Sequence, residues 1–279
     1  MGVLLSLVAA VCYGTSDFAA GIGGRRGDAG AVAIIAQPLT LVAAVVAVLV
    51  AAAPAPTASA LWWGAAAGIG SGIGTLALYR GLATARMSVV APLSGVLTAA
   101  LPVVVGAFLG DRLPWLSWVG VAVAVPAALL VSLHPGADGR AQHSGVAEGI
   151  IAGVGFAVLF IALAQAGTDA GAWPLVPTQA VSVVVVVAAA LPPGRRPARE
   201  AWEPSLRPGL LSGVLGGLAA LAYLFATGFG QLAVVAVITA LYPAVTVLMA
   251  RFIEKERWAR LQVVGLVGAI AAVVLIGVG

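Results

Sequence analysis

The chain has 279 residues, of which 62% are hydrophobic and only 9% are charged, and its mean hydropathy is +1.11. Soluble domains carry roughly 25% charged residues, so this composition excludes one and predicts a protein embedded in a lipid bilayer. The net charge of +4 does not indicate a nucleic-acid partner, because the arginines lie in short loops between apolar runs. The single cysteine, Cys12, excludes an intrachain disulfide.

The apolar runs predict helices rather than barrel strands, because they are about 20 residues long and do not alternate in polarity. Gly, Pro and charged clusters divide the chain into ten candidate spans: 2–23, 29–52, 60–83, 88–109, 114–133, 144–166, 171–191, 208–229, 231–252 and 258–278. The first span lacks a basic n-region and contains Asp17, so we expect a retained helix rather than a signal peptide. The segment from Pro192 to Pro208 is too polar to enter the membrane and is expected to be a loop.

The two halves of the sequence resemble each other. The matched glycines are Gly64 with Gly209, Gly68 with Gly213, Gly72 with Gly217 and Gly120 with Gly265. A repeat of this kind in an apolar chain is typical of a duplicated membrane bundle. We therefore expect two five-helix units, residues 1–134 and 144–279, joined by a linker that runs from His134 to His143.

The loop charges predict that the second unit is inverted relative to the first. An odd number of helices per unit requires this inversion, and all of the 14 Lys and Arg residues except Arg112 lie on odd-numbered loops. The positive-inside rule places those loops in the cytoplasm and both termini outside. The predicted fold is therefore an all-α membrane protein with ten transmembrane helices, arranged as two inverted five-helix repeats, in the inner membrane of a bacterial cell.

Five short motifs carry a family resemblance. They are Tyr79-Arg80-Gly81-Leu82-Ala83, Ser88 to Leu93, Gly110-Asp111-Arg112-Leu113, Ala233 to Pro243 and Glu254 to Trp258. With these motifs the chain resembles the EamA-like ten-helix permeases of the drug/metabolite transporter superfamily. The resemblance implies that spans 1, 3, 4, 6, 8 and 9 surround a substrate cavity, that spans 5 and 10 are peripheral, and that transport proceeds by alternating access.

The sequence departs from the family pattern in two respects, and its loop charges conflict with the orientation of many relatives. Asp111 replaces the usual glutamate, and Thr98 occupies the place matched by Pro243, so the fourth span is expected to bend at Pro92 or Pro102 instead. The resemblance implies that both termini lie in the cytoplasm, as in many relatives, whereas the loop charges here predict that both termini lie outside.

Two acidic residues, Asp17 and Glu148, lie within predicted spans. An intramembrane acid is a functional candidate because burying its charge is costly. Both approach the end of the bundle where Arg80 lies. We therefore expect Asp17 and Arg80 to pair when the cavity is closed, and protonation of Asp17 or Glu148 to release a gate. The alternative is that the acids reach the membrane interface and have no role in transport.

Hydroxyl and aromatic side chains recur at helical spacing on the spans expected to line the cavity. The candidates for contact with a substrate are Tyr13, Ser71, Tyr79, Ser94, Thr98, Phe156, Tyr223, Thr239 and Tyr242. The hydroxyls could instead bond to carbonyls of their own helices, and the tyrosines could be interfacial anchors. Gln37 and Gln179 are expected to satisfy backbone groups freed by nearby prolines.

These patterns predict a secondary active transporter, an exporter of a small organic metabolite or amphipathic drug, with protons as the candidate coupling ion. It would act as a monomer or homodimer, without a cofactor or metal, and not as an enzyme. Two alternatives stay open: a lipid-carrier flippase with the same cavity, and a membrane-embedded enzyme acting on a lipid-linked substrate. Such an enzyme would normally show clustered acids for a metal, or a His/Asp pair at a helix end. Here no acid cluster occurs within the predicted spans, and His134 and His143 lie together only in the linker.

Overall fold

The computed structural model describes residues 1–51, 55–108, 114–132, 144–166, 170–191, 197–229, 238–256 and 258–278. Within these ranges the protein is all-helical, with ten helices and no strand. The helices are α1 (Gly2–Arg26), α2 (Ala29–Ala51), α3 (Ala58–Thr84), α4 (Met87–Phe108), α5 (Trp115–Ser132), α6 (Val146–Gln165), α7 (Leu175–Ala190), α8 (Arg199–Phe229), α10 (Tyr242–Phe252) and α11 (Arg260–Val278). Each overlaps one predicted span.

Seven of these helices are long and apolar enough to cross a bilayer, namely α1, α2, α3, α4, α6, α8 and α11. Helices α5 and α7 are apolar but shorter. Helix α10 has 11 residues within the described ranges, because residues 230–237, where its predicted span began, lie outside them. The described residues therefore contain seven candidate spans where the sequence predicted ten.

Several features named from the sequence lie outside the described residues. They are the Asp111-Arg112 pair, the linker from His134 to His143, Arg257 of the Glu254 to Trp258 motif and most of the Ala233 to Pro243 motif. The division of the chain into units 1–134 and 144–279 therefore stays a prediction.

Helix α8 begins earlier than the sequence predicted, at Arg199 instead of about residue 208. Tertiary contacts hold this extension. The backbone N–H of Asp28 donates to Ser205 Oγ at 3.0 Å, and Ser205 Oγ donates to the carbonyl of Ala201 at 2.7 Å. Such contacts let a helix accommodate internal prolines, here Pro204 and Pro208. The polar loop predicted up to residue 208 therefore ends before residue 199.

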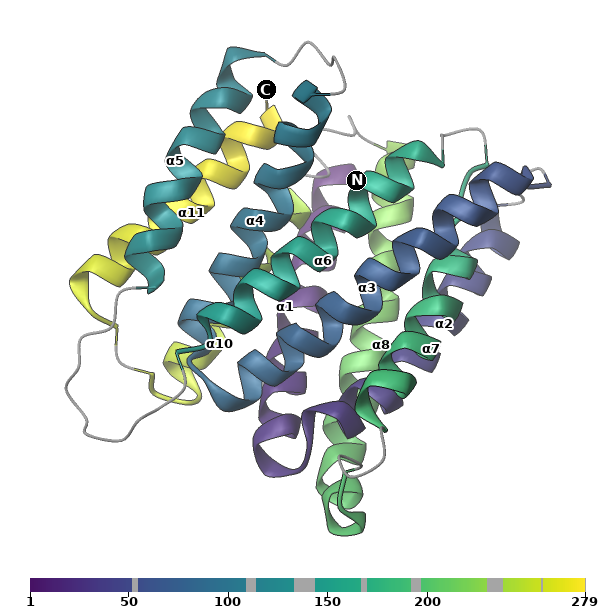
Figure 1. The fold of residues 1–279 in the computed structure, drawn as a ribbon, viewed down its shortest axis with the longest axis horizontal. Coiled ribbons are helices and arrows are strands. Elements are labelled where there is room, and N and C mark those ends of the chain that lie inside the picture. Colours follow the sequence, from purple (N-terminus) through teal and green to yellow (C-terminus); the bar gives the residue numbers. More distant parts are fainter. Residues whose placement is uncertain are drawn as a thin grey trace.

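The helices pack in reciprocal pairs. Helix α1 packs on α8 and α3 packs on α6, while α2 packs on α8 and α7 packs on α3. Helix α10 packs on α1 and α4. Helices α5 and α11 pack mainly on each other and lie side by side at one edge of the bundle (Figure 1). This edge position agrees with the peripheral role that the family resemblance implied for the fifth and tenth spans.

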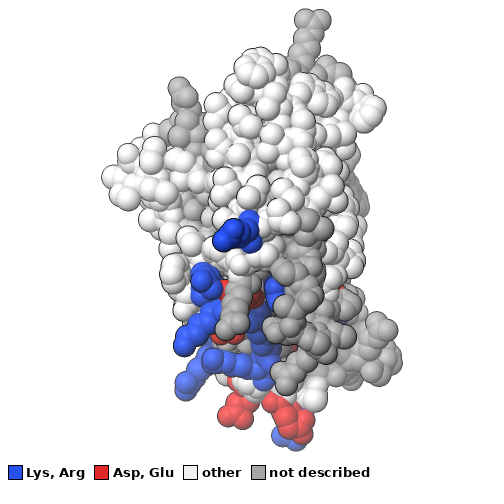
Figure 2. Space-filling model, turned by 90° about the vertical axis from the view of Figure 1, so that its left-hand side faces the viewer, with Lys and Arg blue, Asp and Glu red and all other residues white. Residues whose placement is uncertain are grey.

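The charged residues of the described ranges gather at one end of the bundle. Helix α1 ends at Arg26, α8 begins at Arg199 and α11 begins at Arg260. Figure 2 shows the basic and acidic side chains together over the lower half of one face, with uncharged residues above. This end is called the charged end below. Asp17 is the exception, because it is buried within α1.

Helices α3 and α6 cross with their backbones in direct contact. A Cβ added at Gly70 would lie 2.5 Å from the carbonyl oxygen of Gly155, and one added at Gly155 would lie 2.8 Å from that of Gly70. Neither position has room for a side chain. Close contact through small residues is the usual basis of helix packing in membranes, where no hydrophobic force drives helices together.

We predict that Gly155→Ala lowers the stability of the bundle by about 1–3 kcal/mol, because the added methyl group must separate two backbones. Thermal unfolding of the purified protein in detergent measures this loss. Gly216→Ala is the matched control, since a Cβ there would meet its nearest neighbours, Ser16 Oγ and Thr40 Cγ2, only at 3.5 Å. Equal unfolding temperatures for the two variants would contradict the close contact.

Candidate functional site

Asp17 lies on α1 with only 8% of its surface exposed. Its carboxylate is within electrostatic range of the hydroxyls of Tyr13, Tyr79 and Tyr242, and Tyr13 is within range of Tyr223. These are all 4 tyrosines of the chain, and they come from α1, α3, α8 and α10. Within the described ranges no hydrogen bond or ion pair reaches the carboxylate. We call Asp17 and these tyrosines the tyrosine cluster.

Two serines that the sequence analysis missed hold Tyr79 in this cluster. Ser16 Oγ donates to the carbonyl of Ser212 at 2.8 Å and lies 3.0 Å from Ser212 Oγ. The hydroxyl of Tyr79 lies 2.8 Å from the same Ser212 Oγ. This network links α1, α3 and α8 in the interior. Two features of the sequence could have indicated these serines: both interrupt apolar runs, and Ser16 directly precedes Asp17.

Gly14 allows α1 and α10 to come close enough for their tyrosines to meet. Thr246 Oγ1 donates to the carbonyl of Gly14 at 3.1 Å, and a Cβ at Gly14 would lie 2.6 Å from the carbonyl oxygen of Tyr242. The rings of Tyr13 and Tyr242 are consequently 6.0 Å apart and inclined at 58°. Their faces form an aromatic wall beside Asp17.

Arg80 does not pair with Asp17 in this structure, contrary to the expectation from the sequence. Its exposed guanidinium donates to the carbonyl of Ala189, in the last turn of α7, at 3.4 Å. The two side chains diverge because Asp17 is buried in the bundle whereas Arg80 lies on its surface. At the charged end, the ion pairs of the described residues are instead made by Arg25, with Glu254 and Glu256.

Glu148 and Phe156 lie at the contact between α3 and α6. A Cβ at Gly81 would be 2.8 Å from Cβ of Glu148, and a Cβ at Gly74 would be 2.9 Å from the ring of Phe156. Phe156 also packs against the main hydrophobic core. Both residues therefore help to pack α6 on α3.

The remaining candidates are buried hydroxyls. Ser71 is 7% exposed and lies on the face of α3 that also carries Tyr79. Ser94 and Thr98 lie on α4, and Thr239 precedes α10; within the described ranges their hydroxyl oxygens are buried without a hydrogen-bond partner. Because such groups are costly to leave unpaired, these hydroxyls are available to a polar ligand.

Gln37 links α2 to α7 outside the cluster. Its side-chain amide donates to Ser182 Oγ at 3.0 Å, and Thr40 Oγ1 donates to its side-chain carbonyl at 2.9 Å. The side-chain oxygen of Gln179 is buried without a partner in the described part of the chain. Gln37 therefore bonds to side chains of α2 and α7, and not to the proline-freed backbone groups that the sequence suggested.

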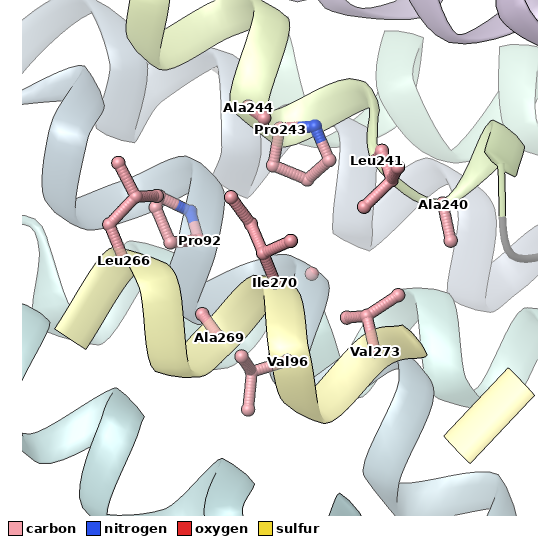
Figure 3. A pocket seen from close by; sticks show the side chains of 11 residues that line it. Pro92, Val96, Ala240, Leu241, Pro243, Ala244, Leu266, Ala269, Ile270 and Val273 are labelled. Atoms are coloured by element: carbon pink, nitrogen blue, oxygen red, sulfur yellow. The ribbon is translucent and has the colours of Figure 1, made fainter. Parts of the chain in front are cut away.

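A small apolar pocket lies between α4, the start of α10 and α11 (Figure 3). Its wall includes Pro92, Val96, Leu241, Pro243, Leu266 and Ile270. Ligand sites need a few placed polar groups to orient a molecule, and none of the side chains that line this pocket is polar. The tyrosine cluster, with a carboxylate, hydroxyls and ring faces together, is therefore the better candidate.

The cluster also differs from a metal site. Metal ions are held by several carboxylate, imidazole or thiolate ligands, and Asp17 is its single carboxylate. Among the described residues, no group of three or more His, Cys, Asp or Glu side chains could hold a metal ion. The chemistry that this arrangement supports is proton binding and recognition of a polar or aromatic ligand.

We predict that Tyr79→Phe lowers the stability by about 1 kcal/mol, because it removes a buried hydrogen bond to Ser212. The double variant Tyr79→Phe/Ser212→Ala is expected to lose less than the sum of the two single changes, since both remove the same bond. Unfolding of the four proteins in detergent measures this cycle. Tyr223→Phe is the control, because its hydroxyl forms no hydrogen bond within the described ranges, and additive losses would contradict the network.

Comparison with known proteins agrees with this architecture. A solved crystal structure superposes with a TM-score of 0.56 over 97% of this chain and 97% of its own, at 17% sequence identity, which shows a shared fold and nothing more. No curated protein sequence matches significantly. The sequence model of the EamA-like transporter family matches residues 143–278. This match confirms the resemblance inferred from the motifs, and it identifies the protein as an integral membrane protein whose second half belongs to the EamA-like transporter family of the drug/metabolite transporter superfamily.

Proposed function

We propose that this protein is a proton-coupled secondary active transporter that exports a small organic metabolite or amphipathic drug by alternating access. The observation that carries the proposal is the tyrosine cluster, in a chain that contains an EamA-like transporter unit. A carboxylate at membrane depth is stable only when it is protonated or compensated by a charged or polar partner. Among the described residues Asp17 has tyrosine hydroxyls nearby but forms no ion pair or hydrogen bond with any residue, so a proton is the natural compensating group.

The lining of the cluster suits an amphipathic molecule. The ring faces of Tyr13 and Tyr242 offer apolar contact, and in this proposal the unpaired hydroxyls of Ser94, Thr98 and Thr239, on α4 and before α10, offer hydrogen bonds to the polar part of the molecule. Tyr79 is held in place by Ser212. In this proposal Asp17 exchanges the coupling proton, Ser71 and Tyr223 extend the site, and Glu148 and Arg80 act near the charged end.

We also propose that residues 1–134 and 144–279 are two inverted repeats. The reciprocal packing supports this arrangement: α1 packs on α8 as α6 packs on α3, and α2 packs on α8 as α7 packs on α3. If α1 corresponds to α6, α2 to α7 and α3 to α8, exchanging the corresponding helices turns the α1–α8 contact into the α6–α3 contact and the α2–α8 contact into the α7–α3 contact. The cluster draws α1 and α3 from the first half and α8 and α10 from the second, so that rocking of the halves would expose it to alternate sides.

We place the protein in the bacterial inner membrane with its charged end in the cytoplasm, following the positive-inside rule. A tag fused after Gly279 is then expected on the outer side of the membrane. Protease digestion of the tag in intact spheroplasts and in inverted vesicles measures this orientation. Digestion only in inverted vesicles would reverse the assigned orientation and leave the fold unchanged.

Flux measurements test the coupling role of Asp17. In proteoliposomes exposed to a metabolite panel, Asp17→Asn is expected to abolish accumulation driven by a pH gradient, because an amide cannot carry the proton, while solute exchange continues. The matched control is Glu200→Gln, which removes an acid from the exposed start of α8. Unchanged accumulation in Asp17→Asn would exclude Asp17 as the coupling residue. Movement of labelled polyprenyl lipids without movement of any solute would favour the flippase alternative.

A further inference from the structure

Arg25, at the end of α1, joins parts of the chain that are far apart in sequence. Its guanidinium forms ion pairs with Glu254 at 3.0 Å and with Glu256 at 3.3 Å. The same group donates to the carbonyls of Leu82 and Ala85, at the end of α3, at 3.2 and 3.0 Å. The side chains of Arg25 and Glu256 are only 25% and 11% exposed, so water screens these contacts less than it would an open surface pair.

Glu256 also connects Arg25 to α4. Its two carboxylate oxygens accept the backbone N–H groups of Met87 and Ser88 at 3.0 and 3.2 Å. These groups belong to the first turn of α4, where unpaired N–H groups and the helix dipole favour a negative charge. Arg251 donates to the backbone carbonyl of Glu256 at 2.8 Å and holds the loop against the end of α10.

The backbone between the two glutamates is strained in a way that presents both to Arg25. Lys255 has φ of 56°, and it is the only non-glycine residue with positive φ in the described part of the chain. A lysine in this left-handed region is uncommon and carries a conformational cost, which persists only where the surroundings hold it. The contacts of the flanking Glu254 and Glu256 with Arg25 provide that hold.

We propose that Arg25, Glu254 and Glu256 form a latch that holds the charged end of the bundle closed and must break each time that end opens. All partners from α1, α3 and α4 precede residue 134, whereas both glutamates follow residue 144, so the contacts cross between the two halves. Motion of one half against the other at this end separates them. This inference rests on the proposed transport cycle, and it locates the closing ion pairs at Arg25 rather than at Arg80.

Thiol labelling of purified protein in detergent tests the latch without any substrate or gradient. The reporter is Ser88→Cys in a Cys12→Ala background, because Ser88 is 5% exposed beneath the latch and its hydroxyl has no partner within the described ranges. The measured quantity is the rate of reaction with a water-soluble maleimide. Arg25→Gln is expected to raise this rate about fivefold or more, since even one partly exposed ion pair can shift an equilibrium by about that factor.

Matched variants separate the latch from general effects of charge. Arg26→Gln removes the neighbouring charge, which forms no hydrogen bond or ion pair among the described residues, and it should leave the rate unchanged. Glu254→Gln breaks one pair, so it should give a smaller rise and serves as the test if Arg25→Gln fails to fold. Lys255→Val should raise the rate because a β-branched residue is poorly tolerated at positive φ, whereas Lys255→Gly should not.

Equal rates in the Arg25→Gln and Arg26→Gln proteins would overturn the latch. So would a parent reporter that reacts as fast as a cysteine at exposed Ser59, because the charged end would then already be open. Faster labelling without flux of any solute would support the latch and contradict the transport proposal. Proton-driven flux, together with a labelling rate that Arg25→Gln leaves unchanged, would support the transport proposal and contradict the latch.

Discussion

The hydrocarbon core of a bilayer offers no water, so every polar group placed there needs a partner within the protein. Much of the interior satisfies this constraint through contacts between helices. Ser16, Ser212 and Tyr79 bond to one another, and Thr246 bonds to the carbonyl of Gly14. Asp17 differs from the other buried polar residues because it can carry a charge, and the described structure gives its carboxylate no hydrogen bond or ion pair at the junction of four helices. The proposed function rests on this contrast.

The helical fold followed largely from composition, because a run of about 20 apolar residues has few alternatives in a membrane. All ten described helices overlap predicted spans. The start of α8 could not be found this way. Its first turns are held by Ser205 against Asp28, a contact between residues distant in sequence, and local polarity therefore gave the wrong boundary.

The site was predictable by residue type but not by partner. Buried acids and tyrosines are unusual enough in apolar spans to be recognised, and Asp17 with the tyrosines does form one cluster. Helical spacing shows which residues share a face, but it does not show which neighbour that face meets. In this structure Arg80 therefore has another partner than the expected Asp17, the carbonyl of Ala189. The network of Ser16 with Ser212, which joins α1 to α8, was missed.

In a duplicated bundle, the relative populations of the two end states depend on how the two halves differ. If the halves are inverted repeats, exchanging their conformations converts one end state into the other, and identical halves would populate both equally. Any bias must come from residues that differ between the halves. Arg25 is such a residue, because the corresponding loop of the second half has no basic residue. The ion pairs of Arg25 stabilise closure at the charged end only, so the latch would determine which end the resting transporter keeps closed.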